Sequence, residues 1–259
     1  MQRVLIALTI LVGAGLAGLL PKPAHAFGDV GAFDPCVLLA GGIAGAARPN
    51  AASRWSWEIV QRTSAPARLK PSQVRADDPA IVNGPFVWLS GSSALSPFSP
   101  QEITGLRKFF ALGGLLLVDD AGVADDGRPS AFGRSAREQI ARVLPDTSPI
   151  ALGPDHVLFK TYYLVRRPEG RVKGPQAFDA IVRGGKAQVI FSSHDLGGAL
   201  ARSAMGDWEM QVTPGGEVQR ERAIRLAVNI AMYVLCSNYK DDQVHAPFLM
   251  RRRALPGLP

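Results

Sequence analysis

The chain has 259 residues, of which 47% are hydrophobic, and it carries a formal net charge of +7. This hydrophobic content is enough for a real core, and the length suits one α/β domain or at most two small ones. Beyond residue 26, no segment approaches the roughly 18 uncharged apolar residues of a membrane span, which excludes a transmembrane helix there.

The first 26 residues have the features of a secretory signal peptide. Arg3 supplies the positive charge, residues 4–20 are apolar, and Ala24-His25-Ala26 is a small-x-small cleavage site. We therefore expect cleavage near Ala26 and a periplasmic or secreted protein that begins near Phe27. The alternative is an uncleaved helix that anchors the chain in the inner membrane, because residues 4–20 are only just shorter than a bilayer span.

The basic excess is small and is most concentrated near the C-terminus. Loss of Arg3 and Lys22 with the signal lowers the net charge from +7 to +5, and the densest remaining cluster is Arg251-Arg252-Arg253. Export argues against nucleic acid as a partner. These arginines therefore form either a solvated tail or a weak contact with an anionic membrane surface or an acidic partner.

The N-terminal half alternates short apolar runs with turn signals. Residues 37–40 form an apolar run that a glycine pair ends, which predicts a buried strand. A helix is predicted over residues 54–62, with Ser53 as its cap. Prolines and aspartates over residues 65–85 indicate an irregular connection, and residues 86–89 predict a second buried strand.

The clearest local signal is a capping box formed by Ser99 and Glu102, with proline at the first helical position. Glycines 113–114 end the predicted helix, and residues 115–118 form an uninterrupted apolar strand. Helix, glycine stop and buried strand make one αβ unit of a parallel sheet.

The C-terminal half predicts five further elements. A helix is expected over residues 135–144 and a strand over residues 156–165. Residues 178–182 and 187–192 predict a β-hairpin, although a helix followed by a strand is the alternative interpretation of the glycines between them. The last helix, over residues 218–235, is apolar nearly all round and should be buried against the sheet.

Polar residues stand where three of the predicted strands end. Ligands of an open parallel sheet bind outside the carboxyl ends of its strands, so we expect three pairs to share one rim: Ser90-Gly91, Asp119-Asp120 and His194-Asp195. Together with His156, they are candidates for ligand binding, for a divalent ion or for acid/base catalysis. We predict no cofactor.

These candidates match no diagnostic motif. Strand-terminal aspartates also serve as caps of helices and turns, so a structural role for Asp119, Asp120 and Asp195 is the main alternative. A hydrolase that pairs Ser90 or Ser92 with His194 is less favoured, because the G-x-S-x-G order is missing.

Cys36 and Cys236 are candidates for a disulfide, since such bonds persist in exported proteins. The predicted topology places the end of the last helix and the start of the first strand on one edge of the sheet, opposite the ligand rim. A bond there would stabilise the fold by about 5 kcal/mol in the chain-entropy model.

A polar segment follows the last predicted helix and contains Tyr239, Lys240, Asp241, Asp242 and His245. Its charges, with those of Arg251-Arg252-Arg253, can dock the tail on the domain or contact a partner. Exposed ion pairs contribute only about 0 to 1 kcal/mol each, so a partner role is as reasonable as a stabilising one.

The sequence resembles the bacterial family catalogued as domain of unknown function 4159. The resemblance rests on four motifs: residues 113–120, Asp155-His156 with Tyr162-Tyr163, residues 193–197, and Asn229 with residues 239–247 and 251–253. It implies a three-layer, mostly parallel flavodoxin-like sheet with helices on both faces, as in class I glutamine amidotransferases, and an exported or membrane-tethered protein. It implies no established activity, and glutaminase chemistry is not expected because neither Cys36 nor Cys236 stands on a strand-end elbow.

We therefore expect a signal peptide over residues 1–26, an α/β domain over residues 27–238 and a docked tail over residues 239–259. The expected function is that of a non-catalytic periplasmic binding or scaffolding domain with an envelope protein as its partner. The alternatives are a metal-assisted or acid/base hydrolase that uses the strand-end residues, and a subunit of an assembly with an exposed apolar patch.

Overall fold

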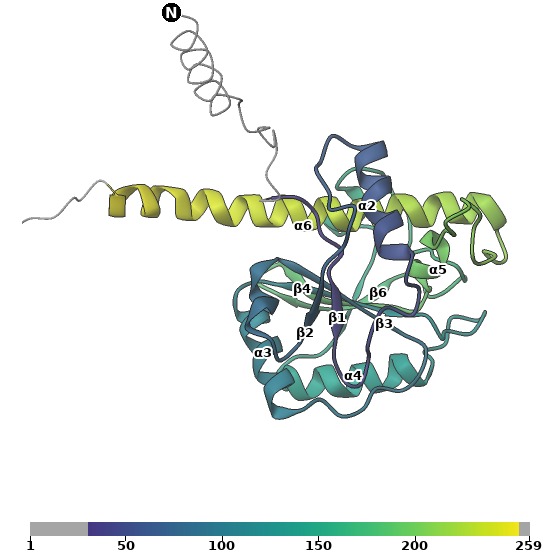
Figure 1. Cartoon of the computed structure of the whole chain (residues 1–259), viewed down its shortest axis with the longest axis horizontal. Coiled ribbons are helices and arrows are strands. Elements are labelled where there is room, and N and C mark those ends of the chain that lie inside the picture. Colours follow the sequence, from purple (N-terminus) through teal and green to yellow (C-terminus); the bar gives the residue numbers. More distant parts are fainter. Residues whose placement is uncertain (1–30, 254–259) are drawn as a thin grey trace, which may run out of the picture. The chain divides into compact units, whose positions relative to one another are not determined.

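The computed structural model describes residues 31–253, and from residue 238 onward only their backbone, so the predicted signal peptide lies outside the described residues. Within this range, seven strands form one sheet in the order β2-β1-β3-β4-β7-β6-β5 (Figure 1). The strands are β1 Val37–Leu39, β2 Gln73–Arg75, β3 Phe86–Gly91, β4 Leu115–Asp120, β5 Ile150–Leu152, β6 Phe178–Arg183 and β7 Lys186–Ser192.

Strands β2, β1, β3, β4 and β7 run parallel, whereas β6 and β5 are antiparallel to their neighbours. The predicted hairpin is confirmed as β6 and β7, and its turn residues Gly184 and Gly185 have φ of 58° and 77°, which a turn of this kind requires. The register pairs Asp119 of β4 with Ser192 of β7. The prediction that these two strands share one sheet and point the same way is therefore confirmed.

Helices cover both faces of the sheet, and they are α2 Ala51–Arg62, α3 Pro100–Ala111, α4 Ala131–Val143, α5 Leu196–Leu200 and α6 Gly216–Arg253. Alternate residues of β3 point to opposite faces, so Trp88 packs with α2, α5 and α6, whereas Leu89 packs with α3 and α4. Figure 1 shows α3 and α4 together on one side and α2, α5 and α6 on the other. The mixed α/β prediction with a mostly parallel sheet is confirmed.

The predicted capping box starts α3. The amide of Glu102 donates to the Ser99 hydroxyl at 3.2 Å, and the Glu102 carboxylate accepts the Ser99 amide at 2.7 Å. The same carboxylate accepts the amide of Gly41 at 2.9 Å, which ties the loop after β1 to this helix.

Several boundaries differ from the predictions. Helix α2 begins at Ala51, not at residue 54, and Ser53 lies inside its first turn and donates to the carbonyl of Asn50 at 3.1 Å. The connection over residues 65–85 contains the short edge strand β2 and the 3₁₀ helix Pro79–Asn83. The strand propensity of these residues does not predict β2, because a three-residue edge strand is held mainly by its pairing with β1.

The strand predicted over residues 156–165 is wrong. His156 instead caps the 3₁₀ helix Val157–Lys160, because its Nδ1 accepts the amide of Leu158 at 3.2 Å. The loose apolar alternation comes from Leu158 and Phe159, which turn inward together and are buried.

The last helix was predicted to end at residue 235, but α6 continues to Arg253. The backbone of residues 239–253 is therefore helical, while their side chains and residues 254–259 lie outside the described part. The docking of this segment on the domain stays a prediction. Over residues 31–253, no helix combines the length and hydrophobicity needed to cross a membrane.

The predicted disulfide is not formed, since Cys36 and Cys236 are both free thiols. Helix α6 reaches the sheet over the start of β7, where the Tyr233 hydroxyl accepts the amide of Ala187 at 3.0 Å. Strand β1 lies three positions away in the sheet, about 14 Å at the usual strand spacing. This lateral offset exceeds the roughly 7 Å that a disulfide spans between Cα atoms.

Candidate functional site

The carboxyl ends of β3, β4 and β7 form one rim, as the sequence predicted, and Asp119 lies at its centre. The amides of Leu196 and Gly197 donate to the two oxygens of Asp119, each at 2.8 Å. Asp119 is fully buried, and burial together with the nearby charge of Asp195 raises its pKa to about 7, although the two backbone donors oppose this shift. Asp119 therefore anchors the start of α5 and is not exposed to a ligand.

Asp120 points to the opposite face of β4 and holds the loop that leads to α4. Its carboxylate accepts the amide of Ser130 at 2.8 Å, the hydroxyl of Ser130 at 2.6 Å and the amide of Gly122 at 3.1 Å. Asp119 and Asp120 thus have the structural capping role that the sequence analysis kept as an alternative.

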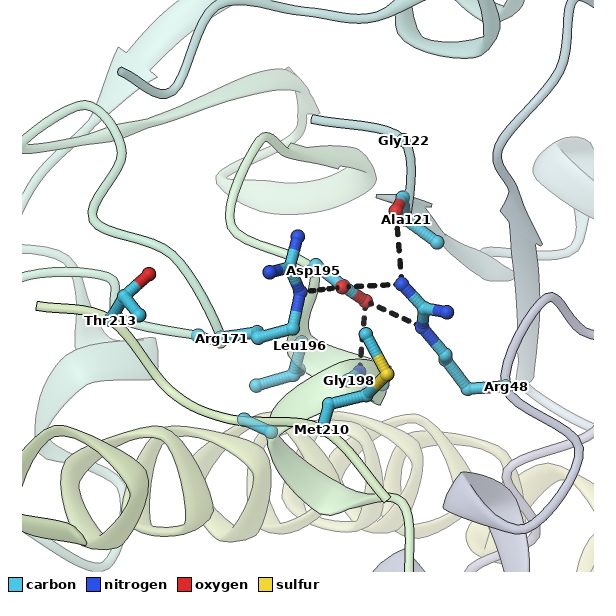
Figure 2. Close-up of polar contacts among 12 residues, drawn as sticks. Arg48, Ala121, Gly122, Arg171, Asp195, Leu196, Gly198, Met210 and Thr213 are labelled. Carbon is cyan, nitrogen blue, oxygen red and sulfur yellow. Dashed lines mark hydrogen bonds and ion pairs between the residues drawn. The ribbon is translucent and has the colours of Figure 1, made fainter. Parts of the chain in front are cut away.

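Asp195 is the most heavily bonded acid of the rim. It adopts the left-handed conformation, with φ of 50°, and its buried carboxylate accepts the amide of Gly198 at 2.9 Å. Two arginines bind the same carboxylate: Arg48 through Nη2 at 2.9 Å and Nε at 3.4 Å, and Arg171 through Nε (Figure 2).

The two arginines come from loops that are distant in sequence. Arg48 lies after β1 and also donates to the carbonyl of Ala121, after β4, at 3.2 Å. Arg171 lies in the loop before β6, and its own amide donates to the carbonyl of Asp195 at 3.1 Å. Asp195 therefore joins its own loop to the loops that carry Arg48 and Arg171, and Arg48 extends the connection to the loop after β4.

Part of each guanidinium remains available. The side chains of Arg48 and Arg171 are 21% and 16% exposed. In the described part of the chain, neither Nη1 of Arg48 nor the Nη atoms of Arg171 have a hydrogen-bond acceptor, and Figure 2 shows the Arg171 Nη atoms directed away from Asp195. The rim thus presents oriented donors to solvent.

His194 lies under the loop of residues 166–177 and is buried. Its Nε2 is 3.0 Å from the carbonyl of Pro175, so Nε2 carries the proton, and burial lowers the pKa of the ring to about 4. A Cβ on Gly174 would lie 2.6 Å from His194 Nε2, which shows how closely the loop covers the ring. His194 is therefore a neutral, sealed side chain.

His156 does not belong to the rim. Its ring packs on Tyr233, with 5.6 Å between ring centroids, and Tyr233 binds the start of β7. Asp195 follows the opposite end of that strand. His156 and the rim carboxylates therefore cannot hold one ligand together.

Ser90 and Gly91 lie at the rim, but both are buried and neither faces solvent. Ser90 pairs with Asp119 in register and is buried, and a Cβ on Gly91 would lie 2.4 Å from the ring of Phe132. The proposed pairing of Ser90 or Ser92 with His194 is not formed in the described residues, because the Nε2 of that ring faces Pro175 and its Nδ1 has no hydrogen-bond partner. A hydrolytic serine pair is thus not assembled here.

Beside Arg171 lies an open pocket of about 410 Å³, lined by Asp125, Asp126, Lys173, Gly174, Thr213 and Pro214. The amide of Thr213 donates to the carbonyl of Arg171 at 2.9 Å, which fixes the pocket next to the arginine. In residues 31–237, no three acidic, histidine or cysteine side chains gather in a way that could hold a metal ion.

Arg48 and Arg171 were missed because single arginines in loops form no motif. One signal was nevertheless present. An antiparallel hairpin brings the start of β6 to the rim where β7 ends, so the basic loop before β6 had to lie there. The loop after β1 reaches the same rim because β1 is parallel to β3 and β4.

The family described as domain of unknown function (DUF4159) matches residues 37–235. The match begins at β1, earlier than the motifs that suggested the resemblance, and it ends before Tyr239, so the polar segment over residues 239–247 lies outside it. No curated protein matches the chain. Because the match covers more than half of the chain, this protein belongs to the DUF4159 family.

Proposed function

We propose that this protein is an exported, non-catalytic binding domain whose rim binds an anionic group of an envelope partner. The observation that carries the proposal is the cluster of Arg48, Arg171 and Asp195. One buried carboxylate orients two guanidinium groups, and the cluster keeps one net positive charge with unused N–H donors.

The position of the cluster supports a binding role. We propose that the sheet is of the flavodoxin-like class shared with glutamine amidotransferases, because its parallel strands follow the order β2-β1-β3-β4-β7. In such sheets the ligand crevice opens between the ends of β1 and β3, the point where the strand order reverses. Arg48 lies in the loop after β1 and reaches across to the ends of β4 and β7.

The bonding of the acids favours binding over hydrolysis. The raised pKa of Asp119 would suit an acid/base catalyst, and this is the observation that favours the alternative of a hydrolase. However, both of its oxygens hold the start of α5, and its side chain is closed to solvent. Hydrolysis at Asp119 would require α5 to move away.

We propose that the domain is exported and that its partner is another protein of the cell envelope. An exported domain meets other envelope proteins, whose carboxylate groups are suitable anions for the rim. We further propose that Arg251, Arg252 and Arg253 give a weak contact with an anionic membrane surface, worth about 1 kcal/mol for each residue near the surface.

Calorimetric titration of the purified protein with phosphate and with glutarate tests the rim. We expect saturable binding that Arg171→Ala weakens about tenfold, the loss of roughly one charge-assisted hydrogen bond. Arg183→Ala is the matched control, since Arg183 is an exposed arginine at the opposite edge of the sheet. Equal affinities for the two variants, or no binding of either anion, would contradict the proposal.

A further inference from the structure

A second arginine cluster surrounds Trp208, in the loop between α5 and α6. Three guanidinium groups lie against its ring, with centroid distances of 4.2 Å for Arg220, 4.6 Å for Arg202 and 5.4 Å for Arg54. Arg54 also lies 3.8 Å from the ring of Trp57, which is 40% exposed. Arginine and tryptophan are the residues that dominate binding energy in protein interfaces.

The three arginines differ in what they bind. Arg220 is buried and donates to two backbone carbonyls and to Glu217, so its role is structural. Arg54 pairs with the buried Glu58. Arg202 is half-buried, and within residues 31–237 it has neither an ion pair nor a hydrogen-bond acceptor, although its Nε is enclosed.

Of the three arginines, Arg202 is therefore the one whose side chain can bind a ligand. Stacking on Trp208 uses the face of the guanidinium, and because Nε is enclosed, only the Nη donors can bind a carboxylate. Burial and, to a lesser extent, the repulsion from Arg202 lower the pKa of Arg54, and an anion between the two arginines would offset that repulsion.

The Trp208 cluster adjoins the rim. The amide side chain of Asn50 donates to the carboxylate of Glu209, the residue after Trp208. Asn50 itself stands two residues after Arg48 and accepts the amide of Arg54 at 3.2 Å on its carbonyl. The loop that carries Arg48 and the loop that carries Arg202 are thus in direct contact.

We infer that Arg202 and the Arg48–Arg171 rim form one surface that binds an acidic segment of a partner protein, with separate carboxylates on Arg202 and on the rim. The inference rests on the proposed anion-binding function and deepens it. A single small anion fits one of the two subsites, whereas an extended segment with several acidic side chains occupies both and gains from the linkage.

Protein carboxylates fit this surface better than a nucleic acid does. Single-stranded nucleic acids bind by stacking bases on aromatic rings. Three guanidinium groups already lie within 5.4 Å of the centroid of the Trp208 ring, so a base that stacked on this ring would compete with them. What remains available is the donor edge of the arginine.

Calorimetric titration of the full chain with hexaglutamate, phosphate and a six-nucleotide oligothymidylate tests the inference. We expect Arg202→Ala to weaken hexaglutamate binding about three- to tenfold and to leave phosphate binding unchanged. Arg171→Ala should weaken both. Arg183→Ala is the control, and Arg202→Gln, with the melting temperature of each variant, guards against loss of the fold.

The outcomes separate the two proposals. If Arg202→Ala and Arg202→Gln bind hexaglutamate as the unmodified protein does, while Arg171→Ala weakens phosphate binding, the inference is wrong and the anion-binding rim stands. If Arg171→Ala changes neither titration, the proposed function fails. Tighter binding of the oligothymidylate than of hexaglutamate would overturn the assignment of an acidic protein partner.

Discussion

Asp195 shows how one residue can be both strained and indispensable. Its left-handed conformation disfavours most side chains but is tolerated by aspartate and asparagine. The strain is offset by the bonds that its carboxylate makes to Gly198, Arg48 and Arg171. The sequence analysis selected Asp195 as a candidate ligand residue, whereas in the structure its carboxylate is bonded to two arginines of the chain itself.

Replacement of Asp195 tests this role in stability. Asp195→Ala leaves two partly buried arginines without their acid, so we expect it to lower the free energy of unfolding by about 3 kcal/mol or more. Asp195→Asn keeps the backbone conformation and should cost less. Urea denaturation measures both, and Asp207→Ala, which removes an exposed acid, should change stability by less than about 0.5 kcal/mol. Equal effects of Asp195→Ala and Asp207→Ala would refute the role.

His194 makes the free energy of unfolding depend on pH in the acidic range. Its pKa falls from 6.5 in the unfolded chain to about 4 in the fold, so the folded state binds fewer protons between these values. The contribution of His194 to the free energy of unfolding is thus retained above pH 6.5 and is lost progressively as the pH falls toward 4. We expect His194→Gln to remove this slope, measured as urea midpoints at pH 7, 5.5 and 4.5.

Asp119 has the opposite effect on stability over much of the same pH range. Its pKa rises from 3.8 to about 7 on folding, so the folded state binds more protons, and this term weakens the fold as the pH rises from about 4 to 7. Asp119→Asn should flatten that part of the profile, at some cost in stability because one of the two backbone donors loses its acceptor. An unchanged slope in Asp119→Asn would show that the carboxyl is ionised throughout.

At the scale of elements, local signals predicted what local chemistry decides. The capping box of α3, the glycine turn of the hairpin and the buried strands were all predicted, because their causes lie within a few residues. The edge strand β2 and the 3₁₀ helix at Val157–Lys160 were missed, because pairing with β1 and packing under α6 decide them. The end of α6 was missed because its polar extension still permits a helix.

Helix α3 offers a test of packing against local propensity. Alanine favours helices over glycine, yet a Cβ on Gly105 would lie 1.9 Å from the carbonyl oxygen of Ala76. We expect Gly105→Ala to destabilise the protein by at least about 2 kcal/mol. Thr104→Ala, on the exposed side of the same helix, should be nearly neutral. A stabilised Gly105→Ala variant would mean that α3 lies farther from Ala76.

For the whole molecule, the sequence predicted which strand ends form the rim, but it did not predict the two arginines that the rim presents. The order of strands follows from pairing between distant segments, which no local pattern encodes, although the parallel direction of β4 and β7 was predicted correctly. That direction placed Asp119 and Asp195 together. Arg48 and Arg171 escaped notice because their importance depends on the buried acid that they share.

Export is the prediction that concerns the whole chain. We expect signal cleavage after Ala26, so mass spectrometry of protein from the periplasmic fraction of producing cells should find Phe27 as the first residue. Ala26→Leu should block cleavage and leave the protein membrane-bound. An intact Met1 in a soluble cytoplasmic fraction would contradict export.

In the proposed function, Asp195 orients Arg48 and Arg171 so that their unused N–H groups can bind an anion. The most direct measurement is nuclear magnetic resonance of the arginine Nε–H groups during titration with phosphate. We expect saturable shifts for Arg48 and Arg171 and none for Arg183. Shifts of equal size for all three arginines, or none at the rim, would contradict the proposed function.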